Sequence, residues 1–268
     1  MIKAAALTVF LAVLAKAVVA QNTQHIDNLD ATLLPGWQIA AGTHMAGLHL
    51  TLSPGWKTYW RSPGEAGIPP LFNWSGSQNL KSVRVHWPTP AVFQTNGLQS
   101  IGYHDQVTLP LEVTAIDPTK PVRLHASVDL GICKDICLPA SLDLTADLNG
   151  PGAPDATIQN ALASQPKDAA KSGLTSIVCI VDPIADGLKI TATLQLPNQG
   201  ATEIVAFETG QPDIWVAEAE TSRSGGTLTS VTDMVAPTGA PFALDRSKIR
   251  LTVFAGGNAV EIHGCPAR

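Results

Sequence analysis

The sequence predicts an all-β protein made of two immunoglobulin-like β-sandwich domains joined by a short, partly helical linker. Three observations favour this fold class. Apolar and polar residues alternate in many short runs, which is the period of a half-buried strand. Gly and Pro, 22 and 20 of the 268 residues, separate these runs. A breaker cluster at 149–154 divides the chain into two halves, each of a size typical of one sandwich.

The amino terminus has the pattern of a secretory signal. Lys3 precedes an apolar stretch, 4–15, that is too short to cross about 30 Å of hydrocarbon as a helix. Small residues at Val18 and Ala20 predict cleavage after Ala20, so that residues 1–20 form a signal peptide. An uncleaved anchor is the alternative, and the interruption at Lys16 argues against it. The mature protein is expected to be exported, which places its cysteines in an oxidising compartment.

Charge excludes one class of partner. The chain has 17 Lys+Arg against 22 Asp+Glu, a net charge of −5, and no basic run or Arg-rich stripe. Nucleic-acid binding is therefore not expected. Gly-rich phosphate loops, Gly-x-Ser-x-Gly elbows and His-Glu-x-x-His motifs are also missing from the sequence, so it does not favour a nucleotide-binding protein or a hydrolase.

The first half, residues 21–150, is predicted to form one sandwich. Alternating apolar positions predict strands at 46–52, 83–87, 107–113, 122–130 and 142–148. Pro110 lies inside one of these runs and predicts an edge or bulged strand there. The last two runs are expected to pair as a hairpin.

A linker over 151–172 and a second sandwich over 173–268 are predicted to follow. Asp155 can cap one short helix that turns Ile158, Ala161 and Leu162 toward an apolar surface, and Pro166 ends it. Further alternating runs predict strands at 188–196, 249–253 and 259–263.

Two of the four cysteines, Cys133 and Cys137, lie on the predicted connection between the hairpin strands, Gly131–Ala140. If this Cys-x-x-x-Cys segment forms one helical turn, the Cα atoms lie about 6 Å apart, within the range of a disulfide. So short a ring adds little stability, which suits a bond that is made and broken. Lys134 would favour a thiolate and Asp135 would oppose it.

Two other interpretations of this pair stay open. It can be a structural staple of the hairpin, or a metal site, of which monovalent copper bound by two thiolates is the least demanding. No His lies within five residues of either cysteine, so a zinc site is not expected and no metal or cofactor is predicted.

The other two cysteines are expected to form a structural disulfide. Cys179 lies in the first predicted strand of the second domain, and Cys265 lies three residues from the carboxyl end. A bond between them would tie the two ends of one sandwich together. Two free thiols or an intermolecular bond are the alternatives.

A run of aromatic and turn-forming residues, 54–70, is interpreted as a core-packing strand followed by an ordered loop. A surface that binds a partner or peptide is the alternative, since exposed Trp and Tyr are common hot spots.

Three segments in order resemble a known family. GWKTYWRSPGEAGIPPLFNW, WPTPAVFQTNGLQSIGYHDQVTLPLEV and VDLGICKDICLP resemble the amino-terminal periplasmic domain of the thiol:disulfide interchange protein DsbD, closest to the ScsB branch. The resemblance implies an immunoglobulin-like fold and a redox-active centre at Cys133 and Cys137, with Cys137 forming mixed disulfides. It also implies an aromatic side chain in a cap loop that shields the pair, for which Phe93 and Tyr103 are the candidates.

The implied function is periplasmic thiol:disulfide exchange, an oxidoreductase activity. Reducing equivalents would pass from a membrane-embedded thiol transporter, here a separate chain, to periplasmic thioredoxin-like proteins. Two rival functions stay open: a copper-binding module for copper tolerance that uses the same thiolates, and a structural interaction domain with two inert disulfides.

Overall fold

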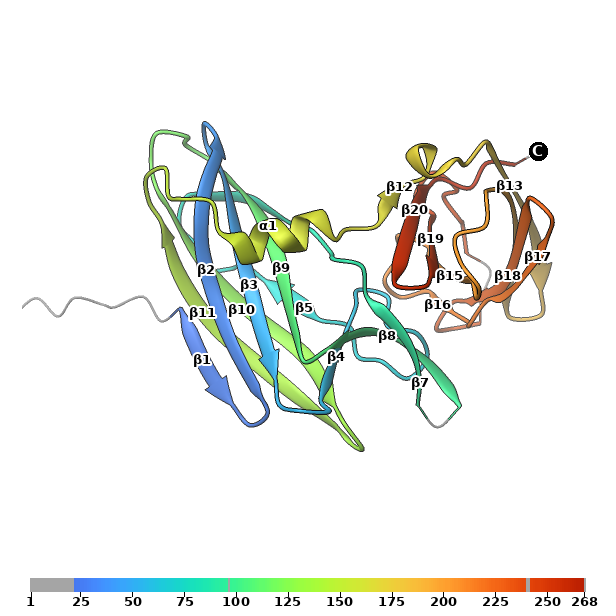
Figure 1. Ribbon diagram of the computed structural model, residues 1–268, viewed down its shortest axis with the longest axis horizontal. Helices are drawn as coiled ribbons and strands as arrows, with labels where there is room; N and C mark the ends of the chain where they lie inside the picture. The colour runs from blue at the N-terminus through green and yellow to red at the C-terminus, as the bar shows by residue number, and fades with distance from the viewer. Residues whose placement is uncertain (1–21, 96, 240–241, 268) are drawn as a thin grey trace, which may run out of the picture.

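The computed structural model describes residues 22–95, 97–239 and 242–267; the predicted signal peptide lies outside them. Over this part the chain is almost entirely β, which confirms the predicted fold class. Figure 1 shows two bodies of strands, one blue to green and one orange to red, with the helix α1 lying across the first. Among the described residues, no helix has the length and apolar character that membrane crossing requires.

Two sheets build the first sandwich. One sheet contains, in order, β1 (Thr23–Ile26), β2 (Leu29–Ala40), β3 (Thr43–Leu52), β9 (Gln106–Ala115) and β6 (Leu80–Val85). The other contains β11 (Cys137–Leu148), β10 (Val122–Cys133), β4 (Lys57–Tyr59), β8 (Leu98–His104) and β7 (Ala91–Thr95), and β5 (Leu71–Asn73) also pairs with β10. Apolar side chains from both sheets, such as Leu33, Leu48, Leu111, Leu124 and Leu144, are fully buried between them.

The second sandwich has the same plan. One sheet contains β12 (Lys167–Asp168), β20 (Asn258–His263), β19 (Arg250–Ala255) and β15 (Ile204–Glu208). The other contains β13 (Ser176–Ile184), β14 (Gly187–Gln195), β18 (Thr227–Val235) and β16 (Trp215–Val216), with β17 (Glu220–Ser224) also on β18. Ile190, Leu194, Leu228, Ile249 and Val253 are fully buried in its core.

The segment between the sandwiches is attached to both. Helix α1 (Ala156–Ala163) begins where the Asp155 carboxylate accepts hydrogen bonds from the backbone of Thr157 and Ile158, as the sequence predicts. Ile158 is fully buried against the first sandwich, where it contacts Gly47. A short 3-10 helix, η1 (Ala170–Ser172), follows β12, which pairs in parallel with β20 and so joins the second sandwich.

The expectation for Pro110 is wrong. Strand β9 is not an edge strand, because it lies between β3 and β6, and the pairing with both runs without a bulge at Pro110. The Pro110 carbonyl accepts from His86 N on the β6 side, one residue beyond the end of β6. The N–H that proline lacks would also point toward β6. The missing hydrogen bond therefore falls just beyond the end of the ladder between β6 and β9.

Candidate redox site

The first cysteine pair closes the hairpin formed by β10 and β11. The two strands pair without interruption from Val122↔Leu148 to Cys133↔Cys137, and the two cysteines form a disulfide with a Cα–Cα distance of 4.1 Å. Only residues 134–136 connect them, with Lys134 N donating to Ile136 O at 3.1 Å. The predicted pairing is confirmed, whereas the helical turn and the long connection Gly131–Ala140 are wrong. Cross-strand pairing brings the Cα atoms closer than a helical turn would.

The two sulfur-bearing residues differ in access. Cys133 is 1% exposed, whereas Cys137 is exposed at the start of β11. Of the two residues, Cys137 is therefore the more accessible to an incoming thiolate. This asymmetry agrees with the roles that the family resemblance implies.

The disulfide lies on the outer face of its sheet. Along β10 the core residues are even-numbered, up to Ile132, so the odd-numbered Cys133 points to the opposite face. Directly paired residues share a face, which places Lys57 beside Cys133 and His104 beside Lys57. Cys133 and Lys57 are both buried on this outer face, so other side chains cover them.

An aromatic side chain that the sequence did not single out contacts the pair. The Tyr59 hydroxyl lies 3.7 Å from Cys137 Sγ, and it is the donor because the disulfide sulfur carries no hydrogen. Tyr59 is 2% exposed, and burial raises the pKa of its hydroxyl, so it is a neutral donor at neutral pH. In the sequence, the one indication of Tyr59 was its place in the aromatic run 54–70, which was interpreted as a core-packing strand followed by a loop.

The two cap-loop candidates lie on opposite faces of the sheet. Phe93 of β7 pairs with Ser100, on the face that carries the disulfide. The centroids of the Phe93 and His104 rings lie 4.6 Å apart. The Lys57 ammonium lies 4.9 Å from the centroid of the Phe93 ring. Tyr103 lies in the core, where its hydroxyl donates to Pro88 O at 2.9 Å. Of the two, Phe93 is the side chain placed to shield this face.

The two candidates for tuning the thiolate, Lys134 and Asp135, lie in the exposed turn between the cysteines. The Lys134 side chain runs over Gly55, and its ammonium lies 3.5 Å from Pro54 O. The sequence placed both residues beside the pair, and the structure keeps them there in solvent. In the described part of the chain, His, Cys, Asp and Glu side chains form no group of three or more that could hold a metal ion.

The second disulfide joins Cys179 to Cys265, with Cα atoms 5.5 Å apart, which confirms the predicted pairing. Both residues are 1% exposed, in the core of the second sandwich. Arg246 ties the two ends further, because its guanidinium donates to Cys179 O at 2.9 Å. This bond is enclosed, in contrast to the one at the hairpin tip.

Comparison with protein families relates the segment that holds the exposed pair to a known domain. Residues 30–149 match the family model for the N-terminal domain of the thiol:disulfide interchange protein DsbD. The matched segment contains both Cys133 and Cys137, and the resemblance stated from the sequence is confirmed. The match ends just before the helix α1.

A solved structure extends the likeness of fold beyond the matched segment. The N-terminal periplasmic domain of ScsB from Proteus mirabilis superposes with a TM-score of 0.69 at 23% sequence identity. The alignment covers 92% of this chain and 98% of that one, so the fold is shared across both sandwiches. No curated protein matches the chain.

Proposed function

We propose that this protein exchanges dithiol for disulfide in the periplasm through Cys133 and Cys137. The observation that carries the proposal is the unequal exposure of the two cysteines at the tip of a hairpin, within a segment that matches the DsbD N-terminal family. A disulfide with one exposed cysteine, closing a ring of only a few residues, is suited to exchange more than to stabilising a fold.

In the oxidised protein, a thiolate of a reduced donor attacks Cys137 Sγ. The Cys133–Cys137 bond breaks, Cys133 leaves as a thiolate and takes up a proton, and a mixed disulfide forms between the donor and Cys137. The second donor thiol then displaces Cys137, so the donor ends as a disulfide and the pair as a dithiol. The two electrons leave by the same route in reverse, when the Cys137 thiolate attacks an acceptor disulfide and Cys133 resolves the intermediate.

We propose a membrane-embedded thiol transporter as the donor and periplasmic thioredoxin-like proteins as the acceptors. The predicted signal peptide and the periplasmic origin of the similar ScsB domain support this compartment. Phe93 would shield the pair between encounters, and Lys134 and Asp135 would adjust the Cys137 thiolate. We assign these reactions to a redox domain at 21–150 that a linker at 151–172 joins to a second domain at 173–268.

The test compares two single variants, Cys133→Ala and Cys137→Ala, each mixed with an oxidised thioredoxin-like protein. We expect Cys133→Ala to accumulate a mixed disulfide on non-reducing gels, because Cys137 attacks and nothing resolves the product. Cys137→Ala, the matched control, should trap little. Equal trapping by both variants would overturn the assigned roles, and trapping by neither would overturn the redox function.

A further inference from the structure

Three consecutive residues link the redox pair to the second sandwich. Tyr59, which ends β4, contacts Cys137 as described above. The fully buried ring of Trp60 packs edge-on against Phe254 of β19, with centroids 5.4 Å apart. Arg61 then reaches carboxylates of β15 and β20. The second sandwich is thus in contact with the chain directly beside the residue that touches the disulfide.

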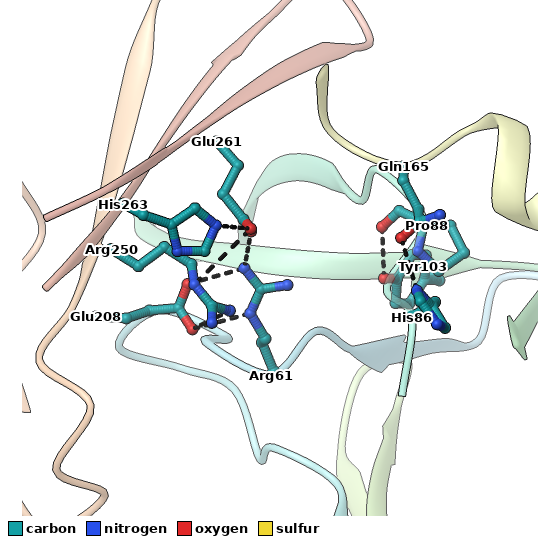
Figure 2. A network of polar contacts seen from close by, with 9 residues as sticks. All are labelled: Arg61, His86, Pro88, Tyr103, Gln165, Glu208, Arg250, Glu261 and His263. Atoms are coloured by element: carbon teal, nitrogen blue, oxygen red, sulfur yellow. Dashed lines mark hydrogen bonds and ion pairs between the residues drawn. The ribbon is translucent and has the colours of Figure 1, made fainter. Parts of the chain in front are cut away.

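Arg61 makes the polar part of this link, which Figure 2 shows from close by. Its Nε and Nη2 donate to the two carboxylate oxygens of Glu208 at 2.9 and 3.0 Å, and Nη2 also donates to Glu261. The guanidinium stacks on Trp60, 4.1 Å from the ring centroid. Burial alone would lower the pKa of Arg61, but the two carboxylates raise it above its usual value, so the group stays charged.

The carboxylates are held from the other side by their own sandwich. Arg250 Nη1 lies 3.9 Å from Glu208 Oε1, and Arg250 Nε lies 3.8 Å from Glu261 Oε1. His263 Nε2 lies 2.9 Å from Glu261 Oε1. A bidentate guanidinium–carboxylate pair fixes direction as well as distance. Arg61 therefore has a defined position only while β15 and β20 present these two groups.

The segment that follows Arg61, residues 62–70, lies over the outer face of the sheet that contains β10 and β11. Pro63 O accepts from Ile101 N at 2.8 Å. Gly67 packs so closely on the Tyr59 ring that a Cβ there would lie 2.8 Å from it. Ile68 covers Gly131, where a Cβ would lie 2.7 Å from the Ile68 side chain. Tyr59 and Gly131 share the face of Cys133, so this segment and Tyr59 together form a cover beside the disulfide.

We propose that the second sandwich positions this cover, and that Arg61 is the positioning residue through which it acts. Glu208 and Glu261 hold Arg61, and Arg61 fixes both Tyr59 and the segment 62–70 on either side of it in the chain. The second domain thereby restricts attack on the Cys137 sulfur by small thiols and shifts the equilibrium between disulfide and dithiol. This inference rests on the proposed redox function and assigns the second domain a part in it.

The test is a double variant, Glu208→Gln with Glu261→Gln, which keeps side-chain size and removes the charges that hold Arg61. A matched control is Glu203→Gln, because Glu203 pairs with Arg223 within the second sandwich and its side chain is only 5% exposed. The control weakens a buried ion pair of the same domain without touching the residues 59–70.

Two quantities are measured on each protein by alkylation and mass mapping. They are the rate at which dithiothreitol reduces Cys133–Cys137 and the equilibrium constant of this bond against glutathione. We expect dithiothreitol to reduce Cys133–Cys137 about threefold faster or more in the double variant. The equilibrium constant of this bond against glutathione should change by a similar factor, which is the size of effect that coupling between two sites usually produces. Cys179–Cys265 in the same molecules should be unaffected, and the control should match the wild type.

Unchanged rate and equilibrium constant in the double variant would overturn the inference, as would an equal change in the control. If the double variant does not fold, the single variant Glu261→Gln, which leaves the bidentate pair with Glu208 in place, is tested by the same two measurements and the same criteria. Failure of the proposed function is a separate outcome, since it appears as a wild-type Cys133–Cys137 bond that does not exchange with glutathione at all.

Discussion

Removing the enclosed disulfide should destabilise the protein without stopping thiol exchange. The perturbation is the double variant Cys179→Ala with Cys265→Ala, which avoids placing hydroxyl groups in sites that are 1% exposed. Cys179 lies in β13, the first long strand of the second sandwich, and Cys265 follows β20, the last. Without the bond, the unfolded state of this sandwich gains freedom that the cross-link removes.

The magnitude follows from the separation of the cysteines along the chain. Loop-closure entropy gives about 4.6 kcal/mol at 25 °C for the separation of 86 between Cys179 and Cys265. The same relation gives about 1.9 kcal/mol for the separation of 4 between Cys133 and Cys137. The first loss corresponds to a fall in melting temperature of about 10 °C or more, and the second to less than half of that.

The assay is thermal unfolding followed by circular dichroism, together with the rate of thiol exchange of the folded protein at 25 °C. The matched control is the double variant Cys133→Ala with Cys137→Ala, whose melting temperature should fall by less than half as much and which should lack exchange. The reasoning is refuted if this control loses as much stability as the Cys179/Cys265 variant. It is equally refuted if the Cys179/Cys265 variant is folded at 25 °C but has lost exchange at Cys133–Cys137.

Two further predictions concern single side chains. Tyr59→Phe in a Cys133→Ala background should raise the pKa of the Cys137 thiol, because the hydroxyl near its sulfur is lost. Thiolate absorbance at 240 nm, followed against pH, measures this pKa. An unchanged midpoint would contradict a role for the Tyr59 hydroxyl. The pKa of Asp117 should be about 2, because the hydroxyl and backbone N–H of Thr119 and the Lys120 ammonium all donate to its carboxylate. Since the pKa of Asp117 is depressed in the folded state, the stability that this carboxylate contributes is present above about pH 4 and is lost as pH falls toward 2. Carbon-13 NMR titration measures the pKa, and an ordinary value near 3.8 would contradict the prediction.

Local pattern was enough to predict the helix and under half of the described strands, among them both strands of the hairpin that holds the first cysteine pair. The alternation along 122–130 and 142–148 separates the core face of the hairpin from its outer face, and burial in β10 and β11 follows it residue by residue. The helix start at Asp155 was predictable for the same reason, since an N-cap depends only on its next three residues.

The features that the sequence did not reveal depend on pairing between distant segments. Pro110 lies in an interior strand because β6 ends one residue short of it, and nothing within β9 indicates where β6 stops. Arg61 binds carboxylates 147 and 200 residues further along the chain. Tyr59 was assigned to core packing because the face of so short a strand as β4 is set by its neighbours β8 and β10.

The place of the exposed disulfide explains how one fold can hold both redox states. The sandwich core lies on the Ile132 side of β10, and the bond lies on the opposite face of the same strand. The ladder between β10 and β11 runs the full length of the hairpin, so its backbone hydrogen bonds can hold the two strands together when the sulfurs separate. Breaking the bond therefore removes neither core packing nor strand pairing, and its effects stay with the groups on the outer face. Those groups are Lys57, Tyr59 and the cover attached through Arg61, which makes them the part of the molecule where the two redox states can differ.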